Sequence, residues 1–133
     1  MFYKNARIFC KDFSFREGAF EVTGGKFGEI LPKDVPADAI DLQGATVIPG
    51  LVDVHSHGNS GADFSDGDYE GLMTMAAYYA SVGVTSFAPA SMTLPYDVLE
   101  KAFGTAKRLV EEDIEGLSVL RGIQMEGPFF SYA

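Results

Sequence analysis

The side chains best suited to chemistry are the only two histidines of the chain, His55 and His57, which lie two positions apart. They end a short apolar run at residues 51–54. Because the side chains of a β-strand alternate between its two faces, residues two apart point to the same side. Two imidazoles that converge at the end of a strand can chelate a divalent cation, so the spacing predicts part of a metal site.

The surroundings of the two histidines extend this pattern. Taken alone, a His-x-His pair is also what two surface histidines at the end of a strand would give. Here the run starts after Pro49-Gly50, carries Asp53 two residues before the first histidine, and passes into a loop rich in glycine and aspartate at residues 58–67. A strand followed by such a loop is typical of the edge of an active site.

A second pattern lies near the other end of the chain. Residues 124–129 read Gln-Met-Glu-Gly-Pro-Phe and place Glu126 at the end of a further predicted strand. Catalytic groups of α/β barrels lie where strands end, so we expect Glu126 at the same rim as His55 and His57. Nitrogen and carboxylate ligands together suit zinc or ferrous iron. The alternative for Glu126 alone is an ordinary carboxylate at a strand end.

Together, the two patterns resemble those of the N-acetylglucosamine-6-phosphate deacetylase family, part of the amidohydrolase superfamily of metal-dependent (β/α) barrel hydrolases. The resemblance covers the whole chain but only the opening part of that family's length. It implies an enzyme that removes acetate from N-acetylglucosamine 6-phosphate, of which this chain is an N-terminal fragment, inactive alone. Dihydroorotase-like and deaminase-like amidohydrolases share the Asp-x-His-x-His strand and stay alternatives, as does a non-catalytic fragment that self-associates.

The resemblance also implies roles for individual residues. Glu126 corresponds to the metal-binding glutamate of the family, and His55 and His57 correspond to histidines that hold a second metal in some members. A divalent metal, zinc or iron, as one or two ions, is therefore expected. In that family the bound metal polarises the acetamide carbonyl and activates water. The general base, an aspartate, and two further histidine ligands come from later strands, beyond Ala133, so this chain offers no identifiable catalytic base.

The aspartates near the histidines have more than one interpretation. By alternation, Asp53 shares the strand face of His55 and His57. It could accept a hydrogen bond from an imidazole and so orient a metal ligand, or it could make a structural hydrogen bond lower in the barrel. Asp63 and Asp66, in the loop that follows, are expected to be solvated carboxylates or helix caps.

Composition limits the partners and the location of the protein. A net charge of −9 argues against nucleic acid, whose phosphates require a cationic surface. The single cysteine, Cys10, excludes an intrachain disulfide. The N-terminus lacks a signal-peptide pattern, and no apolar run approaches the roughly 18 residues that span a bilayer, so we expect a cytoplasmic protein without a membrane partner. The partners expected are a small amino-sugar phosphate, implied by the resemblance, and further copies of the chain, because a barrel fragment exposes strand edges.

Residues 1–49 are predicted to form the N-terminal part of a small β domain, a portion of a β-sandwich. Alternating apolar and polar runs at 19–23 and 26–31 flank two glycines, which is a strong hairpin signal. Further short strands are expected at residues 6–10, 39–42 and 45–48. Together these five strands predict a β-meander.

Residues 50–133 alternate between predicted strands and helices. Strands are expected at 51–54, 84–88 and 117–125. One helix runs from a cap at Asp66 or Asp68 to Val82, and a second runs from Pro95 to Glu112. This order predicts an α/β fold with about three parallel strands and two helices, the start of a TIM-type barrel. A complete barrel takes about 250 residues, so the barrel is expected to be incomplete.

The spacing of apolar residues in the two helices predicts which face of each is buried. The expected buried residues are Leu72, Met75, Ala76 and Tyr79 in the first helix, and Val98, Leu99, Ala102, Ala106 and Leu109 in the second.

Overall fold

The computed structural model describes residues 1–31, 35–127 and 129–131. Residues 32–34, 132 and 133, and Pro128 of the second sequence pattern, lie outside the described residues. The chain divides into two compact units, Met1–Pro49 and Gly50–Ala133, and each is described by itself.

The first unit is a single five-stranded sheet. Strands β1 (Phe2–Phe9), β2 (Phe15–Thr23) and β3 (Lys26–Leu31) pair antiparallel in sequence order, as predicted for a meander. Strands β4 (Ile40–Asp41) and β5 (Thr46–Val47) both pair parallel to β1, so the predicted meander is wrong for these two. The sandwich of which this sheet would be a part stays a prediction.

The parallel pairing of β4 and β5 has a local cause. Strand β1 is long enough to pair with both short strands, one after the other, along the edge that β2 leaves open. Between them the chain turns at Gln43 and Gly44, both with positive φ, 53° and 82°. The carbonyl of Asn5, itself at φ 56°, accepts a hydrogen bond from the N–H of Gly44 at 2.7 Å. The turn is therefore stabilised by its contact with β1, which the residues of the turn alone do not reveal.

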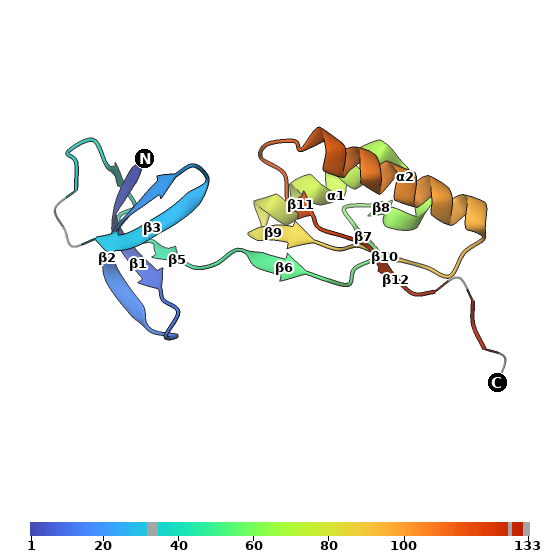
Figure 1. Ribbon diagram of the computed structural model, residues 1–133, viewed down its shortest axis with the longest axis horizontal. Helices are drawn as coiled ribbons and strands as arrows, with labels where there is room; N and C mark the ends of the chain where they lie inside the picture. Colours follow the sequence, from blue (N-terminus) through green and yellow to red (C-terminus); the bar gives the residue numbers. More distant parts are fainter. Residues whose placement is uncertain (32–34, 128, 132–133) are drawn as a thin grey trace. The chain divides into compact units, whose positions relative to one another are not determined.

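The second unit contains a parallel sheet with the order β11-β9-β6. Its strands are β6 (Leu51–Asp53), β9 (Val84–Phe87) and β11 (Val119–Leu120), and helices α1 (Tyr69–Ser81) and α2 (Tyr96–Glu112) follow the first two of them. Figure 1 shows both helices on one side of this sheet. The predicted α/β class, with two helices between three parallel strands, is confirmed. Over the described residues the sheet is open and no barrel closes.

Four further strands of two residues each extend beyond this sheet. Strands β7 (Gly58–Asn59) and β8 (Ala62–Asp63) form a small antiparallel hairpin. Strands β10 (Ala90–Ser91) and β12 (Gln124–Met125) pair parallel to one another.

The single strand predicted at residues 117–125 is therefore wrong, because the chain there forms β11 and β12 in two different sheets. The N–H of Arg121 bonds to the carbonyl of Phe87, and the N–H of Gln124 bonds to that of Pro89, at 2.9 Å each. The chain advances three residues from Arg121 to Gln124 against two residues from Phe87 to Pro89, which is the arrangement of a β-bulge. The bulge divides the strand.

Both helices begin and end close to their predicted limits. Asp68 caps α1 by accepting a hydrogen bond from the N–H of Gly71 at 2.9 Å, and Gly83 follows the helix at φ 83°. Pro95 lies at the N-cap position of α2. Among the described residues, no helix is both long enough and apolar enough to cross a membrane. The predicted stripes are confirmed, except that Val98 is only half-buried; the buried residues are Leu72, Met75, Ala76 and Tyr79 in α1, and Leu99, Ala102, Ala106 and Leu109 in α2.

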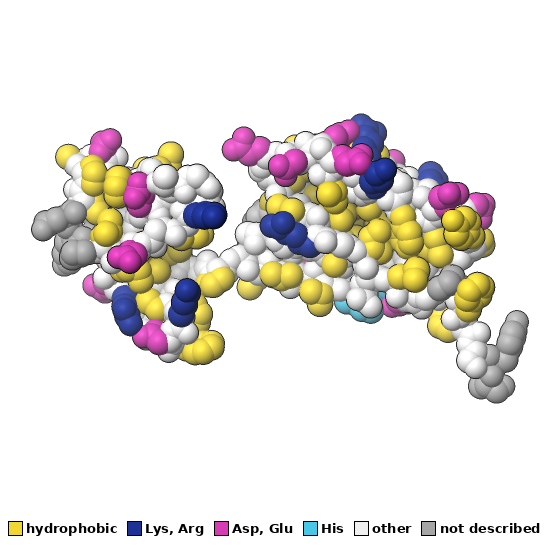
Figure 2. Space-filling view, viewed as in Figure 1, with side chains coloured by type: hydrophobic (Ala, Val, Ile, Leu, Met, Phe, Trp, Pro, Cys, Tyr) yellow, Lys and Arg dark blue, Asp and Glu magenta, His cyan; other side chains and the backbone are white. Residues whose placement is uncertain are grey.

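The helices cover only one face of the parallel sheet. Phe87 and Leu120, 1% and 7% exposed, belong to the core cluster beneath the helices. On the opposite face, Val52 and Val119 pair with the same residue of β9, Ser86, and keep 63% and 38% of their surface exposed. Figure 2 shows hydrophobic side chains along the edge of this unit that lies away from the helices. The described residues thus leave the second face of the sheet uncovered.

The core under the helices supports a prediction about stability. Met75 is 0% exposed, whereas Met92 is 45% exposed. We expect Met75→Ala to lower the free energy of unfolding by about 2–5 kcal/mol, because it removes buried contacts and leaves a cavity. The matched change Met92→Ala should stay within about 0.5 kcal/mol of the unsubstituted chain. Urea unfolding followed by circular dichroism measures both, and equal shifts would contradict this assignment of the core.

Candidate metal centre

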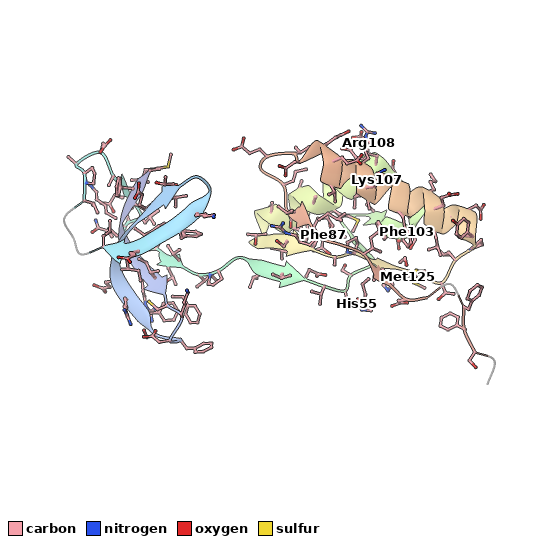
Figure 3. The ribbon with its side chains drawn as sticks, in the orientation of Figure 1. His55, Phe87, Phe103, Lys107, Arg108 and Met125 are labelled. Carbon is pink, nitrogen blue, oxygen red and sulfur yellow. The ribbon has the colours of Figure 1, made fainter. Side chains whose placement is uncertain are left out.

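The two histidines and the glutamate singled out from the sequence meet in the structure. The Nε2 atoms of His55 and His57 lie 2.8 Å and 3.3 Å from one carboxylate oxygen, Oε1 of Glu126. One ligand atom from each of the three residues lies within 4.8 Å of the other two. Figure 3 shows His55 near Met125, the residue that precedes Glu126 in the chain. Side chains 71 positions apart in sequence thus form one group.

A short central segment holds the two parts of this group together. On one side, the N–H of Ala90 donates to the carbonyl of Ser56 at 2.9 Å. On the other side, the N–H of Gln124 donates to the carbonyl of Pro89 at the same distance. The hydroxyl of Thr93 also lies 3.5 Å from the carbonyl of Glu126. Residues 89–93 therefore lie between the segment that carries the histidines and the segment that carries the glutamate.

Strand alternation is not the reason why both histidines point toward Glu126. Strand β6 ends at Asp53, before either histidine. The ladder continues with Ala88 N–H to the Asp53 carbonyl and Ala90 N–H to the Ser56 carbonyl. Three residues on the histidine side oppose two on the other, as in the bulge before Gln124. The convergence is confirmed, but the reason given for it from the sequence is wrong.

The group is open to solvent and chemically suited to a metal ion. The side chains of His55, His57 and Glu126 are 51%, 34% and 31% exposed. Zinc binds imidazole nitrogen and carboxylate oxygen at about 2.0–2.2 Å, which places its ligand atoms about 3–4 Å apart. The separations from the glutamate oxygen are close to these values, so small side-chain adjustments would suffice. The three donors fit a divalent ion with further coordination positions left open.

The contact of Asp53 differs from the imidazole contact considered from the sequence. Its Oδ1 accepts a hydrogen bond from the backbone N–H of His55 at 3.1 Å. Among the described residues, the buried Nδ1 of His57 has no hydrogen-bond partner. The structure therefore connects Asp53 to the backbone that carries the first histidine, not to either ring.

The loop after the histidines has a structural role. Asp63 caps the short 3-10 helix η1 (Phe64–Asp66) by accepting from the N–H of Ser65 at 2.8 Å. The carbonyl of Asp66 accepts from the ammonium group of Lys101 at 2.9 Å. Asp63 is therefore a helix cap, one of the two roles expected for these loop carboxylates, while the contact of Asp66 is made by its backbone.

The sequence reading missed residues 89–93, which join the two halves of the group. The predicted strand stopped at residue 88, one residue too early to include this segment. The signal was present, because residues that follow the carboxyl end of a parallel strand in an α/β fold are those that reach the site.

Comparison with known proteins gives consistent results. Residues 38–106 match the amidohydrolase family. An N-acetylglucosamine-6-phosphate deacetylase from Vibrio furnissii is 36% identical over 95 residues, which cover 71% of this chain and 24% of that protein. The crystal structure of N-acetylglucosamine-6-phosphate deacetylase from Pasteurella multocida matches 98% of this chain and 35% of its own, with 29% identity and a TM-score of 0.84.

A third similar protein was solved with a ligand. It is a variant of N-acetyl-D-glucosamine-6-phosphate deacetylase from Mycobacterium smegmatis, in complex with N-acetyl-D-glucosamine-6-phosphate. It matches 98% of this chain and 33% of its own, with 25% identity and a TM-score of 0.74. This chain thus spans about a quarter to a third of the length of the relatives it matches.

Gly58, the residue after the second histidine, is closely packed, and its substitution supports a prediction. A Cβ atom on Gly58 would lie 2.0 Å from the carbonyl oxygen of Ala62 across the β7–β8 hairpin, so the backbone would have to shift. We expect Gly58→Ala to destabilise the chain by about 1–3 kcal/mol and to move the carbonyl of His57 away from the N–H of Phe64, now 2.8 Å away. Chemical unfolding and amide hydrogen exchange at Phe64 measure these effects.

A matched control is available in α2. A Cβ atom on Gly104 would meet no atom within 4 Å. Gly104→Ala should therefore raise the free energy of unfolding, by up to about 1 kcal/mol, because alanine favours the helix. Equal effects of the two substitutions would contradict the close packing proposed at Gly58.

Proposed function

Because this chain belongs to the amidohydrolase family, we propose that it is part of a metal-dependent hydrolase that removes acetate from N-acetylglucosamine 6-phosphate and leaves glucosamine 6-phosphate. The observation that carries the proposal is the convergence of His55, His57 and Glu126 at one edge of a parallel sheet. Relatives named as deacetylases of this sugar phosphate support the choice of substrate, including the one with the sugar phosphate bound. No observation favours the dihydroorotase-like or deaminase-like alternatives.

In this proposal His55, His57 and Glu126 are ligands of a divalent metal, zinc or iron. When bound, the metal polarises the acetamide carbonyl and lowers the pKa of a water molecule toward neutrality. The protein side chains hold and orient this centre, and the exposure of all three leaves room for substrate. Because Oε1 of Glu126 lies close to both imidazoles, these three side chains together would hold the metal, expected as one ion or two.

The open sheet is the start of a TIM-type barrel in this proposal. Its face opposite the helices, which includes Val52 and Val119, would line the barrel interior. The general base and further histidine ligands would come from strands outside these 133 residues, so the chain by itself would be inactive. Self-association of the isolated chain and a cytoplasmic location stay predictions.

The metal site can be tested on the chain alone. We expect the dialysed protein to retain zinc or iron, and Glu126→Gln to weaken zinc binding by at least about tenfold, because an amide replaces the carboxylate ligand. Glu100→Gln makes the same change at an exposed position of α2 and should leave binding unaltered. Elemental analysis and competition with a chromophoric chelator measure the two quantities. A chain that retains no metal, or equal binding by both variants, would argue against the site.

The reaction can be tested in a chimeric enzyme. The part of the Pasteurella multocida deacetylase that matches this chain is replaced by residues 1–133. We expect acetate release from N-acetylglucosamine 6-phosphate, reduced by about a hundredfold or more in His57→Ala because a metal ligand is lost. The Pasteurella enzyme without its matching part is the control and should be inactive. A folded, metal-loaded chimera that releases no acetate, or that acts instead on cyclic amides or aminopurines, would exclude the proposed substrate.

A further inference from the structure

The hydrogen bonding between β6 and β9 changes immediately before the histidines. The N–H of Ala88 donates to the carbonyl of Asp53 at 2.8 Å. In a regular parallel ladder, the N–H of His55 would then donate to the carbonyl of Ala88. Among the described residues the structure shows no such bond; the N–H of His55 donates to the side-chain Oδ1 of Asp53 instead, at 3.1 Å.

This replacement has a consequence for the path of the backbone. The next ladder bond runs from the N–H of Ala90 to the carbonyl of Ser56. The chain therefore uses three residues, from Asp53 to Ser56, against two residues of its neighbour, from Ala88 to Ala90. An extra residue in one strand bends that strand and re-aims its side chains. His55 lies within this bulge and His57 directly follows it, and these are the two side chains that meet Glu126.

We propose that Asp53 is a positioning residue for the metal ligands, which ends β6 by holding the backbone N–H of His55 and so turns both histidines toward Glu126. The inference rests on the proposed function in one respect, that the histidines bind metal. The hydrogen bond itself and the bulge do not depend on it.

The same device ends other strands of this chain. Asp41 is the last residue of β4, and its Oδ1 accepts from the N–H of Gln43 at 2.8 Å. Asp63 is the last residue of β8 and accepts from the N–H of Ser65, also at 2.8 Å. An aspartate that bonds to the N–H two residues on is a local alternative to the ladder. Asp53 is the one of the three that stands directly before the metal-binding group.

The alternatives for Asp53 make different demands on its side chain. A backbone acceptor needs only an oxygen at Oδ1, which asparagine also supplies. A carboxylate that binds the metal acts through its charge, which asparagine lacks. In Asp53→Ala the N–H of His55 loses this acceptor, so the bulge is no longer held and the histidines are no longer fixed toward Glu126.

Zinc affinity separates these alternatives. We expect Asp53→Asn to bind zinc within about threefold of the unsubstituted chain and Asp53→Ala to bind at least about tenfold more weakly. Asp41→Ala removes the same kind of hydrogen bond in the other unit and should not change zinc affinity. Competition with a chromophoric chelator measures all four proteins. Binding by Asp53→Asn as weak as that by Asp53→Ala, or full binding by Asp53→Ala, would overturn the proposal.

A second measurement does not depend on metal. Hydrogen exchange of the His55 amide, followed by NMR without zinc, should be equally slow in the unsubstituted chain and Asp53→Asn and about tenfold faster in Asp53→Ala. Unchanged exchange in Asp53→Ala overturns the proposal whatever zinc does. If the unsubstituted chain binds no zinc, the proposed function fails at its metal site, and this exchange rate still decides the role of Asp53.

A substitution that prevents folding must also be distinguished. Should circular dichroism show that Asp53→Ala is unfolded, Asp53→Ser replaces it, because a serine hydroxyl is a weaker acceptor for the same N–H. The proposal then expects exchange of the His55 amide to be faster in Asp53→Ser than in Asp53→Asn. Equal rates in these two variants and the unsubstituted chain would overturn it.

Discussion

The group of His55, His57 and Glu126, the candidate metal centre, depends on how two chain segments pair with one short central segment at the carboxyl end of the parallel sheet. The segment after β6 uses three residues, Asp53 to Ser56, against two of its neighbour, and the segment after β11 does the same between Arg121 and Gln124. Each of these bulges adds one residue on its own side of residues 87–90. As a result the side chains of His55 and Glu126, one from each of the two segments, lie 2.8 Å apart.

The same ladder explains why these three side chains are accessible. Because β6 and β11 end before His55, His57 and Glu126, these side chains extend past the sheet and stay 31–51% exposed. The helices fill the other face, where Met75 and Phe87 are buried, so the core that stabilises the unit is separate from the group of His55, His57 and Glu126. A substitution in one should therefore affect the other only through the backbone.

One set of polar contacts at the surface joins the two helices. The acidic end of α2 is placed unfavourably for the helix dipole, yet Arg108 lies 2.7 Å from Glu112 and its guanidinium stacks 3.6 Å above the ring of Tyr69. Hydrogen bonds from Tyr69 and Arg108 lower the pKa of Glu112. These contacts connect the start of α1 to the end of α2 and hold in place the layer that covers the sheet.

The sequence by itself determined the features that rest on local signals. Asp68, Gly83 and Pro95 marked the helix limits, and the spacing of Leu72 and its partners marked the buried faces, because caps and periodicity depend on residues within a few positions. The identity of His55, His57 and Glu126 as a group also came from the sequence, through two short patterns. These features need no knowledge of the neighbouring strand.

Only the tertiary structure decided how the strands pair. The parallel pairing of β4 with β1, the division of residues 117–125 into two strands, and the bulge before Ser56 all depend on which carbonyl of a distant strand is within reach. Strands of two residues carry too little alternation to show which strand they pair with. For the same reason the sequence could place Asp53 beside the histidines but could not show that its carboxylate takes the backbone N–H of His55. Hydrogen-bond register is a property of two segments, and one segment alone does not contain it.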